Sequence, residues 1–503
     1  MKRYASVFSL LLILFSVLFS STEIEIAKAD NTDVYIRADG TVEGTDKIQR
    51  NGDIYTFIDD IYSRIEIQRS NIILDGAGYG LIKGERDFAI NVGIAGDVPE
   101  PIGVNGITIM NLRIIGFNYG ITLGDENNIV QRVNITDGQG YNGVPIWVSG
   151  SNHIINECRI TNNNGYGMLI HATDVLLSNN YISDNSDFGI KFEANTAILR
   201  NNTLNNNRSG PFYISEQTQI SCNAIDPSNI VDGKPVYYWV NEHNKTVPSD
   251  AGYVVLDNCT NINIKNLSIN KNSIGRFFYG SSGIRLTRTT NSVISDNVLN
   301  GTGIYISFSS KDILIDNNRI TNNSINSWGV NISIVENYVS AKEDNGISVG
   351  GSSHEIANNN LTNCKTGIYL QSQQNSVTQN RIVDCGVGIK LFSSNNNNFC
   401  QNSFIDNTQH VSDTHYTLEW PLETYYQSVN NTWDGNFWSG YNGTDTNRDG
   451  FGDTPYIIYE DQQDNYPLMN AIIPEFPSWT ILPAFLIATL SVVVVRKKLV
   501  KSS

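Results

Sequence analysis

Residues Phe188 to Asn207 read Phe-Gly-Ile-Lys-Phe-Glu-Ala-Asn-Thr-Ala-Ile-Leu-Arg-Asn-Asn-Thr-Leu-Asn-Asn-Asn. In the first part of this stretch, the apolar residues Ile190 and Phe192 alternate with the charged residues Lys191 and Glu193. This alternation predicts a short β-strand with one apolar face, and the polar residues that follow predict a turn before the next short strand. One such unit cannot bury its apolar face alone, so the fold must depend on neighbouring units.

The same unit recurs along the chain. Apolar strands that follow a glycine, and that lead to an Asn-x-apolar triplet, also begin at Gly167, Gly303, Gly367 and Gly388. The spacing of these units is roughly 20 to 22 residues, which is typical of solenoid repeats. The units contain only short strands, without the apolar helix pattern of a leucine-rich repeat. The sequence therefore predicts an all-β solenoid, a parallel β-helix whose coils stack at about 4.8 Å.

Asparagines mark one position of the repeat. They stand two residues before the last apolar position of a unit, at Asn180, Asn202, Asn297, Asn318, Asn337, Asn359, Asn380 and Asn402. Asparagine tolerates the left-handed backbone conformation of a tight corner, and stacked amides can form hydrogen bonds along a column. We interpret these residues as a structural ladder rather than as ligand sites.

Four segments resemble a known family. Residues 70–78, Ser-Asn-Ile-Ile-Leu-Asp-Gly-Ala-Gly, resemble its opening coil, and residues 232–239, 436–439 and 449–456 resemble segments common in its archaeal members. The family is the NosD-like group, also called carbohydrate-binding and sugar-hydrolase β-helices. The resemblance covers most of the mature chain and implies a single-stranded right-handed parallel β-helix. Because one fold hosts many activities, the resemblance is weak for function.

Composition divides the 503-residue chain into segments. We expect a secretory signal peptide (1–29), an N-terminal cap (30–69), β-helix coils (70–208), an excursion from the solenoid (209–257), further coils (258–407), an aromatic-rich C-terminal cap (408–470), a linker (471–477), a transmembrane anchor (478–495) and a cytoplasmic tail (496–503). Basic residues after the apolar run place the tail in the cytoplasm and the ectodomain at the cell surface. A Pro-Glu-Phe sequence before the anchor resembles sorting signals of archaeal surface proteins, so the anchor is either retained or processed.

Charge and cysteine usage narrow the function classes. The formal net charge is −16, and only 17% of residues are charged, which argues against nucleic-acid binding because that needs a basic face. Six cysteines form no C-x-x-C pair. Cys364 and Cys385 lie one repeat apart, so they are either a disulfide or two reduced thiols. Because we expect the protein to be exported, its Asn-x-Ser/Thr sequons are candidate glycosylation sites, for example Asn134, Asn201, Asn244, Asn266, Asn331 and Asn442.

A possible calcium loop lies in the C-terminal cap. Oxygen-bearing side chains alternate at Asp445, Asn447 and Asp449, where Phe451 would add its carbonyl and Asp453 would bind directly or through water. The position of the bidentate glutamate of an EF-hand holds a tyrosine instead. The loop is therefore either a calcium site or a plain Asx-rich turn.

Strand alternation predicts two outward-facing rows. In the N-terminal coils, Trp147 is a candidate ligand contact, and His171, Asp174 and Glu193 are the residues that would serve as base and acid in an enzyme. A solvated face with incidental charges is the alternative. In the C-terminal coils the outward residues are Arg285, Tyr305, Ser348, Tyr369 and Lys390, with Phe392 beside them. They form either a sugar-stacking row or an ordinary set of exposed aromatics.

These observations favour a cell-surface β-helix that binds polysaccharide or a surface glycoprotein without catalysis, or that forms part of the envelope. The first alternative is a polysaccharide lyase, hydrolase or epimerase. The second is copper binding, which the NosD resemblance implies through copper handling during maturation of nitrous oxide reductase. Copper would need His, Met or Cys ligands, and the six histidines are scattered.

Overall fold

The computed structural model describes residues 32–92, 103–140, 143–193, 196–214, 224–271, 282–413, 428–459 and 462–472. Every regular element in these ranges is a β-strand. They contain no helix that is long and apolar enough to cross a membrane. The signal peptide (1–29), the anchor (478–495) and the tail (496–503) expected from the sequence lie outside the described residues.

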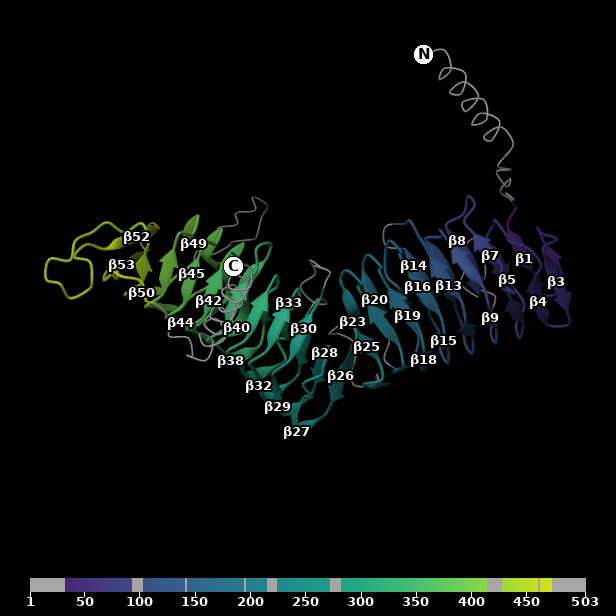
Figure 1. Ribbon diagram of the computed structural model, residues 1–503, viewed down its shortest axis with the longest axis horizontal. Helices are drawn as coiled ribbons and strands as arrows, with labels where there is room; N and C mark the ends of the chain where they lie inside the picture. Colours follow the sequence, from purple (N-terminus) through teal and green to yellow (C-terminus); the bar gives the residue numbers. More distant parts are fainter. Residues whose placement is uncertain are drawn as a thin grey trace, which may run out of the picture.

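Three stacks of strands, which we name sheets N1, N2 and N3, form the N-terminal half of the molecule (Figure 1). Sheet N1 contains β1 (Val34–Ile36), β5 (Ile65–Ile67), β8 (Phe88–Val92), β11 (Tyr119–Leu123), β14 (Val144–Val148), β17 (Met168–Ile170), β20 (Phe188–Phe192) and β23 (Gly210–Ile214), with β2 (Val42–Glu43) at its edge. Sheet N2 contains β3 (Ile48–Asn51), β4 (Ile54–Phe57), β6 (Ile73–Asp75), β9 (Thr108–Met110), β12 (Ile129–Gln131), β15 (Ile154–Asn156), β18 (Val175–Ser178), β21 (Ala197–Arg200) and β24 (Ala224–Ile225). Sheet N3 contains β7 (Gly80–Ile82), β10 (Arg113–Ile115), β13 (Asn134–Thr136), β16 (Arg159–Thr161), β19 (Tyr181–Ser183), β22 (Thr203–Asn205) and β25 (Ile230–Val231).

The C-terminal half repeats this arrangement in sheets C1, C2 and C3. Sheet C1 contains β26 (Lys234–Val240), β28 (Tyr253–Asp257), β31 (Ile284–Thr287), β34 (Ile304–Ile306), β37 (Ile325–Ser327), β40 (Asn345–Ser352), β43 (Thr366–Gln373), β46 (Val387–Leu391) and β49 (Gln409–Asp413). Sheet C2 contains β27 (His243–Thr246), β29 (Thr260–Lys265), β32 (Thr290–Ser295), β35 (Lys311–Asp316), β38 (Val330–Val335), β41 (Glu355–Ala357), β44 (Ser376–Thr378), β47 (Asn398–Cys400) and β50 (Thr432–Asp434). Sheet C3 contains β30 (Ser268–Asn270), β33 (Val298–Asn300), β36 (Arg319–Thr321), β39 (Tyr338–Ser340), β42 (Asn360–Thr362), β45 (Arg381–Val383), β48 (Ser403–Ile405) and β51 (Phe437–Trp438).

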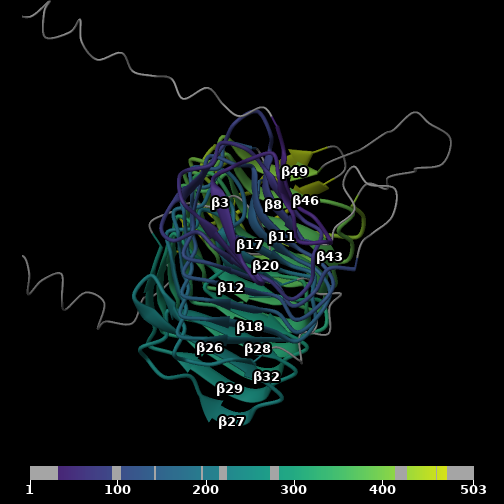
Figure 2. The ribbon, with the colours of Figure 1, turned by 90° about the vertical axis from the view of Figure 1, so that its right-hand side faces the viewer.

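Each coil passes once through the three sheets and stacks on the next, as the view along the solenoid shows (Figure 2). The alternating residues place apolar side chains inside in register, for example Ile146 beside Met168 and Met168 beside Ile190. All three are fully buried. Burying one such side chain stabilises the fold by about 1.5–3 kcal/mol, and the stack repeats this gain coil after coil. The fold is the parallel β-solenoid that the repeat predicts.

The two halves meet at an angle around β26 and β28 (Figure 1). Strand β28 has two apolar faces, because Tyr253 and Val255 belong to the N-terminal core whereas Val254 and Leu256 belong to the C-terminal core. The ring of Tyr253 lies 5.8 Å from that of Phe212, at the end of the N-terminal core. The described parts of residues 209–257, where we expected an excursion, thus contain the strands that join the two cores.

In each half of the solenoid, a ladder of asparagine side chains stabilises one corner of the coils. Side-chain amides donate to the next amide oxygen at 2.9–3.0 Å, from Asn180 through Asn202 to Asn229, and from Asn297 through Asn318, Asn337, Asn359, Asn380 and Asn402 to Asn436. We expected the left-handed backbone conformation at these asparagines, and this was wrong. The residue before each asparagine adopts it instead, for example Glu336 and Gln379, both with φ of 56°. The preceding residue therefore makes the turn at the corner, and the asparagine side chain points into the coil.

Other corners carry ladders that we did not predict. Asn163, Asn185 and Asn207 form one at 2.9–3.0 Å, and Asn375, Asn397 and Asn431 form another at 2.7–3.1 Å. Cys364 and Cys385 occupy an equivalent corner as free, buried thiols, with the Cys364 N–H donating to Cys385 Sγ at 3.4 Å. A thiol here replaces an amide as the acceptor.

Aromatic residues close the C-terminal end of the core. Trp433 stacks on Phe399 at 4.0 Å, and Trp438 stacks on Phe404 at 4.4 Å. The carboxylate of buried Asp464, on the hairpin of β52 (Tyr456–Tyr459) and β53 (Gln462–Asp464), accepts the N–H groups at the end of the long ladder. This hairpin therefore terminates both the core and the ladder.

Candidate functional site

The outer face of sheet N1 gathers aromatic, basic and acidic side chains. Trp147, Leu169, Lys191 and Tyr213 are in register on four successive strands, β14, β17, β20 and β23. Their neighbours along each strand point into the core, so alternation turns these side chains outward. All four are half-buried, which leaves part of each side chain open to solvent.

Ionic contacts connect this row to its edge. Lys191 Nζ lies 2.7 Å from Glu193 Oε1, and His171 Nε2 lies 3.0 Å from Glu193 Oε2. The Lys191 ammonium is 5.1 Å from the centre of the Tyr166 ring and 5.5 Å from that of Tyr213. A cation between two aromatic faces is held by their negative quadrupoles. Trp147 adds a third ring to this set, 6.1 Å from the His171 ring. We name Trp147, Tyr166, His171, Lys191, Glu193 and Tyr213 the N1 cluster.

The environment shifts the pKa of two members of the cluster, Lys191 and Tyr166. Burial acts to lower the pKa of Lys191, but the hydrogen bond to Glu193 and the nearby Tyr166 outweigh it and raise the pKa. Burial, with the charge of Asp187 close by, raises the pKa of Tyr166. At neutral pH the cluster therefore presents an ammonium group and a phenol that keeps its proton. The buried Trp147 Nε1 has no hydrogen-bond partner in the described structure.

Asp174, the third residue that we considered for catalysis, lies apart from this arrangement. It occupies the exposed turn after β17 with φ of 56°, where its backbone N–H donates to Thr196 Oγ1 at 2.7 Å. The His171 side chain lies against Glu193 and Trp147, and Glu193 also contacts Lys191.

The second predicted row is in register but is not an open surface. Arg285 pairs with Tyr305 on sheet C1, and Ser348 pairs with Tyr369, which pairs with Lys390. However, Arg285, Tyr305 and Ser348 are only 2%, 0% and 2% exposed, and the Arg285 guanidinium lies 5.2 Å over the Tyr305 ring. Both faces of β31 and β34 are buried, so the expected sugar-stacking row is wrong for these three residues. Tyr369, Lys390 and the neighbouring Phe392 are half-buried.

The expected calcium loop satisfies its own oxygen atoms. Asp445 and Asp449 accept backbone N–H groups of the loop, including that of Phe451, at 2.9–3.2 Å, and Asn447 Nδ2 donates to Asp449 Oδ2 at 2.9 Å. Hydrogen bonds from a threonine hydroxyl and its N–H lower the pKa of Asp453. No group of three or more His, Cys, Asp or Glu residues in the described ranges could hold a metal ion. The described loop has the contacts of an Asx-rich turn and gives calcium no support.

Family comparisons agree with the geometry of the fold. The model described as periplasmic copper-binding protein (NosD) matches residues 225–443, and the model of the right-handed β-helix region matches residues 102–250. The chain belongs to the NosD-like β-helix family. A search of the curated proteins found no significant match.

A comparison with solved structures found similar chains at low identity. They include the periplasmic alginate epimerase AlgG (11% identity, 80% of this chain and 77% of that chain, TM-score 0.25) and PfbA, a surface adhesin of Streptococcus pneumoniae (11%, 72% and 83%, TM-score 0.25). A mannuronic acid-specific polysaccharide family 6 lyase from human gut microbiota is also similar (12%, 67% and 82%, TM-score 0.29). Scores this low do not bear on function.

Copper, which the family description implies, does not fit His153, His354 or His410. His153 Nε2 lies 2.8 Å from the Ser149 carbonyl and its Nδ1 accepts the Asn128 N–H at 3.3 Å, while His354 Nε2 lies 2.6 Å from a backbone carbonyl. Burial lowers the pKa of both rings. His410 packs among aromatic rings. These three rings have structural contacts within the NosD-like protein. In the part that the structure describes, no two of them lie together with a third residue that could bind a metal ion.

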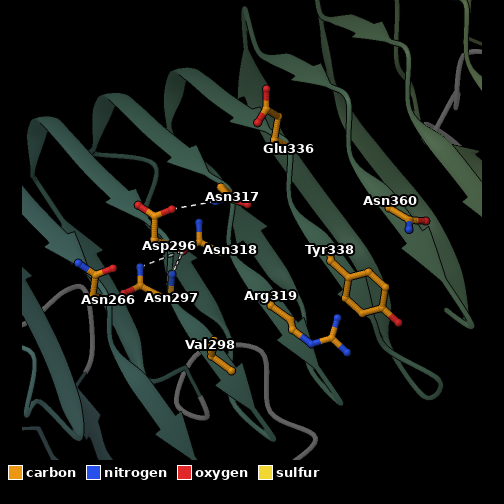
Figure 3. Close-up of a pocket in the computed structure, with 10 residues that line it drawn as sticks. All are labelled: Asn266, Asp296, Asn297, Val298, Asn317, Asn318, Arg319, Glu336, Tyr338 and Asn360. Carbon is orange, nitrogen blue, oxygen red and sulfur yellow. Dashed lines mark hydrogen bonds between the residues drawn. The ribbon is translucent and has the colours of Figure 1, made fainter. Parts of the chain in front are cut away.

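A groove that the sequence analysis missed runs along the corner between sheets C2 and C3 (Figure 3). Its volume is about 630 Å³, and we name it the C3 groove, lined by Asn266, Asp296, Asn297, Val298, Asn317, Asn318, Arg319, Glu336, Tyr338 and Asn360. Charged residues directly before and after successive ladder asparagines are the sequence signal that could have revealed it.

Proposed function

We propose that this NosD-like protein is a polysaccharide-binding protein of the cell surface, and that the N1 cluster is its binding face. One observation carries the proposal: the Lys191 ammonium lies between two tyrosine rings while Glu193 joins it to His171. Export and C-terminal anchoring, expected from the sequence, are part of this proposal.

Sugars suit such a face because they combine apolar C–H surfaces with dense hydroxyl groups. The rings of Trp147, Tyr166 and Tyr213 offer apolar area with a polar edge, and such rings are favoured where a ligand is part apolar and part wet. Lys191 and Glu193 supply a donor and an acceptor that hold each other in place. Because coils repeat at about 4.8 Å, a row on one sheet suits an extended polymer better than a compact ligand.

A second candidate function is an enzyme that cleaves the bound polymer. The specific observation in its favour is the 3.0 Å contact between His171 and Glu193 beside a charged lysine. An imidazole oriented by a carboxylate can act as a general base, and an ammonium group can stabilise negative charge that develops on the substrate.

One experiment separates these functions. The full-length chain in detergent is tested against a panel of acidic and neutral polysaccharides, with retention and the release of reducing or unsaturated ends both measured. Retention without new ends, weakened about tenfold by Trp147→Ala, is expected for a binding protein. The matched control is Tyr369→Ala, a half-buried aromatic on sheet C1, which should leave retention unchanged.

New ends would favour the enzyme, and Glu193→Gln should then abolish their release. Absence of retention on every polymer, or an equal loss in Trp147→Ala and Tyr369→Ala, would overturn the proposed binding face.

A further inference from the structure

We propose that the C3 groove is a second binding site, separate from the N1 cluster, and that it takes a strand of uncharged polysaccharide. The groove lies on the other half of the solenoid and on a different sheet, so this inference does not rest on the function proposed for the N1 cluster. It rests on the shape, the chemistry and the rigidity of the groove.

The shape fits a polymer strand. Residues of five successive coils line the groove, from Asn266 on the first to Asn360 on the last. Five coils span about 19 Å at the usual strand spacing. The volume of about 630 Å³ falls within the range of natural ligand sites, which is about 300–1,000 Å³. A long groove of this kind can hold several sugar units in a row.

Figure 3 shows two rows of side chains along the groove, and the charged residues of the two rows have opposite sign. Asp296, Asn317 and Glu336 form the wall at the corner, and Val298, Arg319 and Tyr338 form the wall on sheet C3. The Arg319 guanidinium lies 4.2 Å from the centre of the Tyr338 ring. Neither Arg319 nor Glu336 forms an ion pair with another described residue, so the donors of one and the acceptors of the other remain available.

Hydroxyl groups match both walls. A hydroxyl donates to a carboxylate and accepts from a guanidinium, so a neutral sugar chain can satisfy Glu336 and Arg319 at once. A polyanion would run along Asp296 and Glu336, whose charges also act on Asp316 and, after burial, help to raise its pKa. A polycation would meet Arg319 in the same way. The ligand favoured by this charge pattern is therefore uncharged.

The floor of the groove is rigid. Asn297 Nδ2 donates to Asn318 Oδ1 at 2.9 Å, and Asn318 Nδ2 donates to Asn337 Oδ1 at 3.0 Å. On the wall, Asn317 Nδ2 donates to Asp296 Oδ1 at 2.8 Å, which orients that carboxylate (Figure 3). A site whose side chains are already ordered loses less conformational entropy when it binds.

The test uses the full-length chain in detergent and three neutral probes: dextran, galactomannan and xyloglucan. Alginate serves as the acidic comparison, and binding is measured by affinity electrophoresis at low and high salt. We expect at least one neutral polymer to bind, with an affinity that added salt does not change, because screening acts on charged ligands. The double variant Arg319→Ala/Tyr338→Ala should weaken that binding by about tenfold or more.

Two controls keep the result specific. The variant Arg159→Ala/Tyr181→Ala removes a similar pair on sheet N3, where the guanidinium lies 4.3 Å from the ring, and should bind as the unaltered chain does. Trp147→Ala should also leave this binding unchanged, which separates the groove from the N1 cluster. The proposal is overturned if no neutral probe binds, if the N3 pair matters as much as the C3 pair, or if alginate is the polymer lost from the groove variant.

Discussion

The variant Asn380→Ala tests how strongly one ladder residue holds the solenoid together. The Asn380 side chain is 1% exposed and makes four hydrogen bonds. Its oxygen accepts the backbone N–H and the amide of Asn359 at 3.0 and 2.9 Å, and its amide donates to the Ile356 carbonyl at 2.7 Å and to Asn402 Oδ1 at 3.0 Å. Alanine removes all four and leaves their buried partners without replacement.

The magnitude follows from this count. A typical intramolecular hydrogen bond contributes about 1 kcal/mol net, and a buried donor or acceptor left unpaired costs a further 1–3 kcal/mol or so. Water entering the small cavity would satisfy some of these groups. We therefore expect the free energy of unfolding to fall by about 4 kcal/mol.

The assay is equilibrium urea unfolding followed by far-UV circular dichroism. The dependence of the unfolding free energy on urea concentration must have the same slope for all variants. The matched control is Gln379→Gly at the neighbouring exposed residue, whose φ of 56° a glycine adopts easily. This control should change stability by less than about 0.5 kcal/mol. A loss below about 1 kcal/mol in Asn380→Ala would refute the argument that the ladder stabilises the corners.

Two other variants probe titratable groups. Burial, together with the charges of Glu336 and Asp296, raises the folded pKa of Asp316, so its contribution to stability is present at low pH and lost as pH rises through that pKa. Asp316→Asn should thus raise the urea midpoint at pH 7 but not at pH 3, and an equal gain at both would contradict this. His153→Ala, which removes two ring hydrogen bonds, should lower stability by about 2 kcal/mol while the Cu²⁺ affinity measured by calorimetry stays unchanged. A loss of Cu²⁺ affinity would show that this ring is a ligand after all.

Local pattern was sufficient for the fold because the solenoid repeats a local rule. The alternation of Ile190 and Phe192 with Lys191 fixes which side of a strand faces the core, and the 20 to 22-residue period, roughly, fixes what stacks on it. The corner conformation was harder to assign. We gave the left-handed backbone to the ladder asparagine, but Glu336 and Gln379 show that the preceding residue adopts it.

The exposure of a site could not be predicted in the same way. Alternation predicts that Tyr305 and Trp147 both point away from the core, yet Tyr305 is fully buried and Trp147 is half-buried. Alternation along a strand predicts which side of the sheet a residue faces. It does not predict whether other residues pack against that side. The C3 groove was missed for a related reason, because it combines Asp296 and Arg319 from different columns of neighbouring coils.

The ladders also separate the residues that stabilise a corner from the wall residues of the C3 groove. The amide of Asn318 fixes the corner from the inside, while Asn317 and Arg319, on either side of it in sequence, lie at the surface of the groove. The residues of the walls can therefore change without removing the ladder amides that form the floor. The two proposed sites lie at different places on the coil. The N1 cluster uses the flat outer row of a sheet, and the C3 groove uses a corner. In both, the side chains follow the regular spacing of the coils, about 4.8 Å.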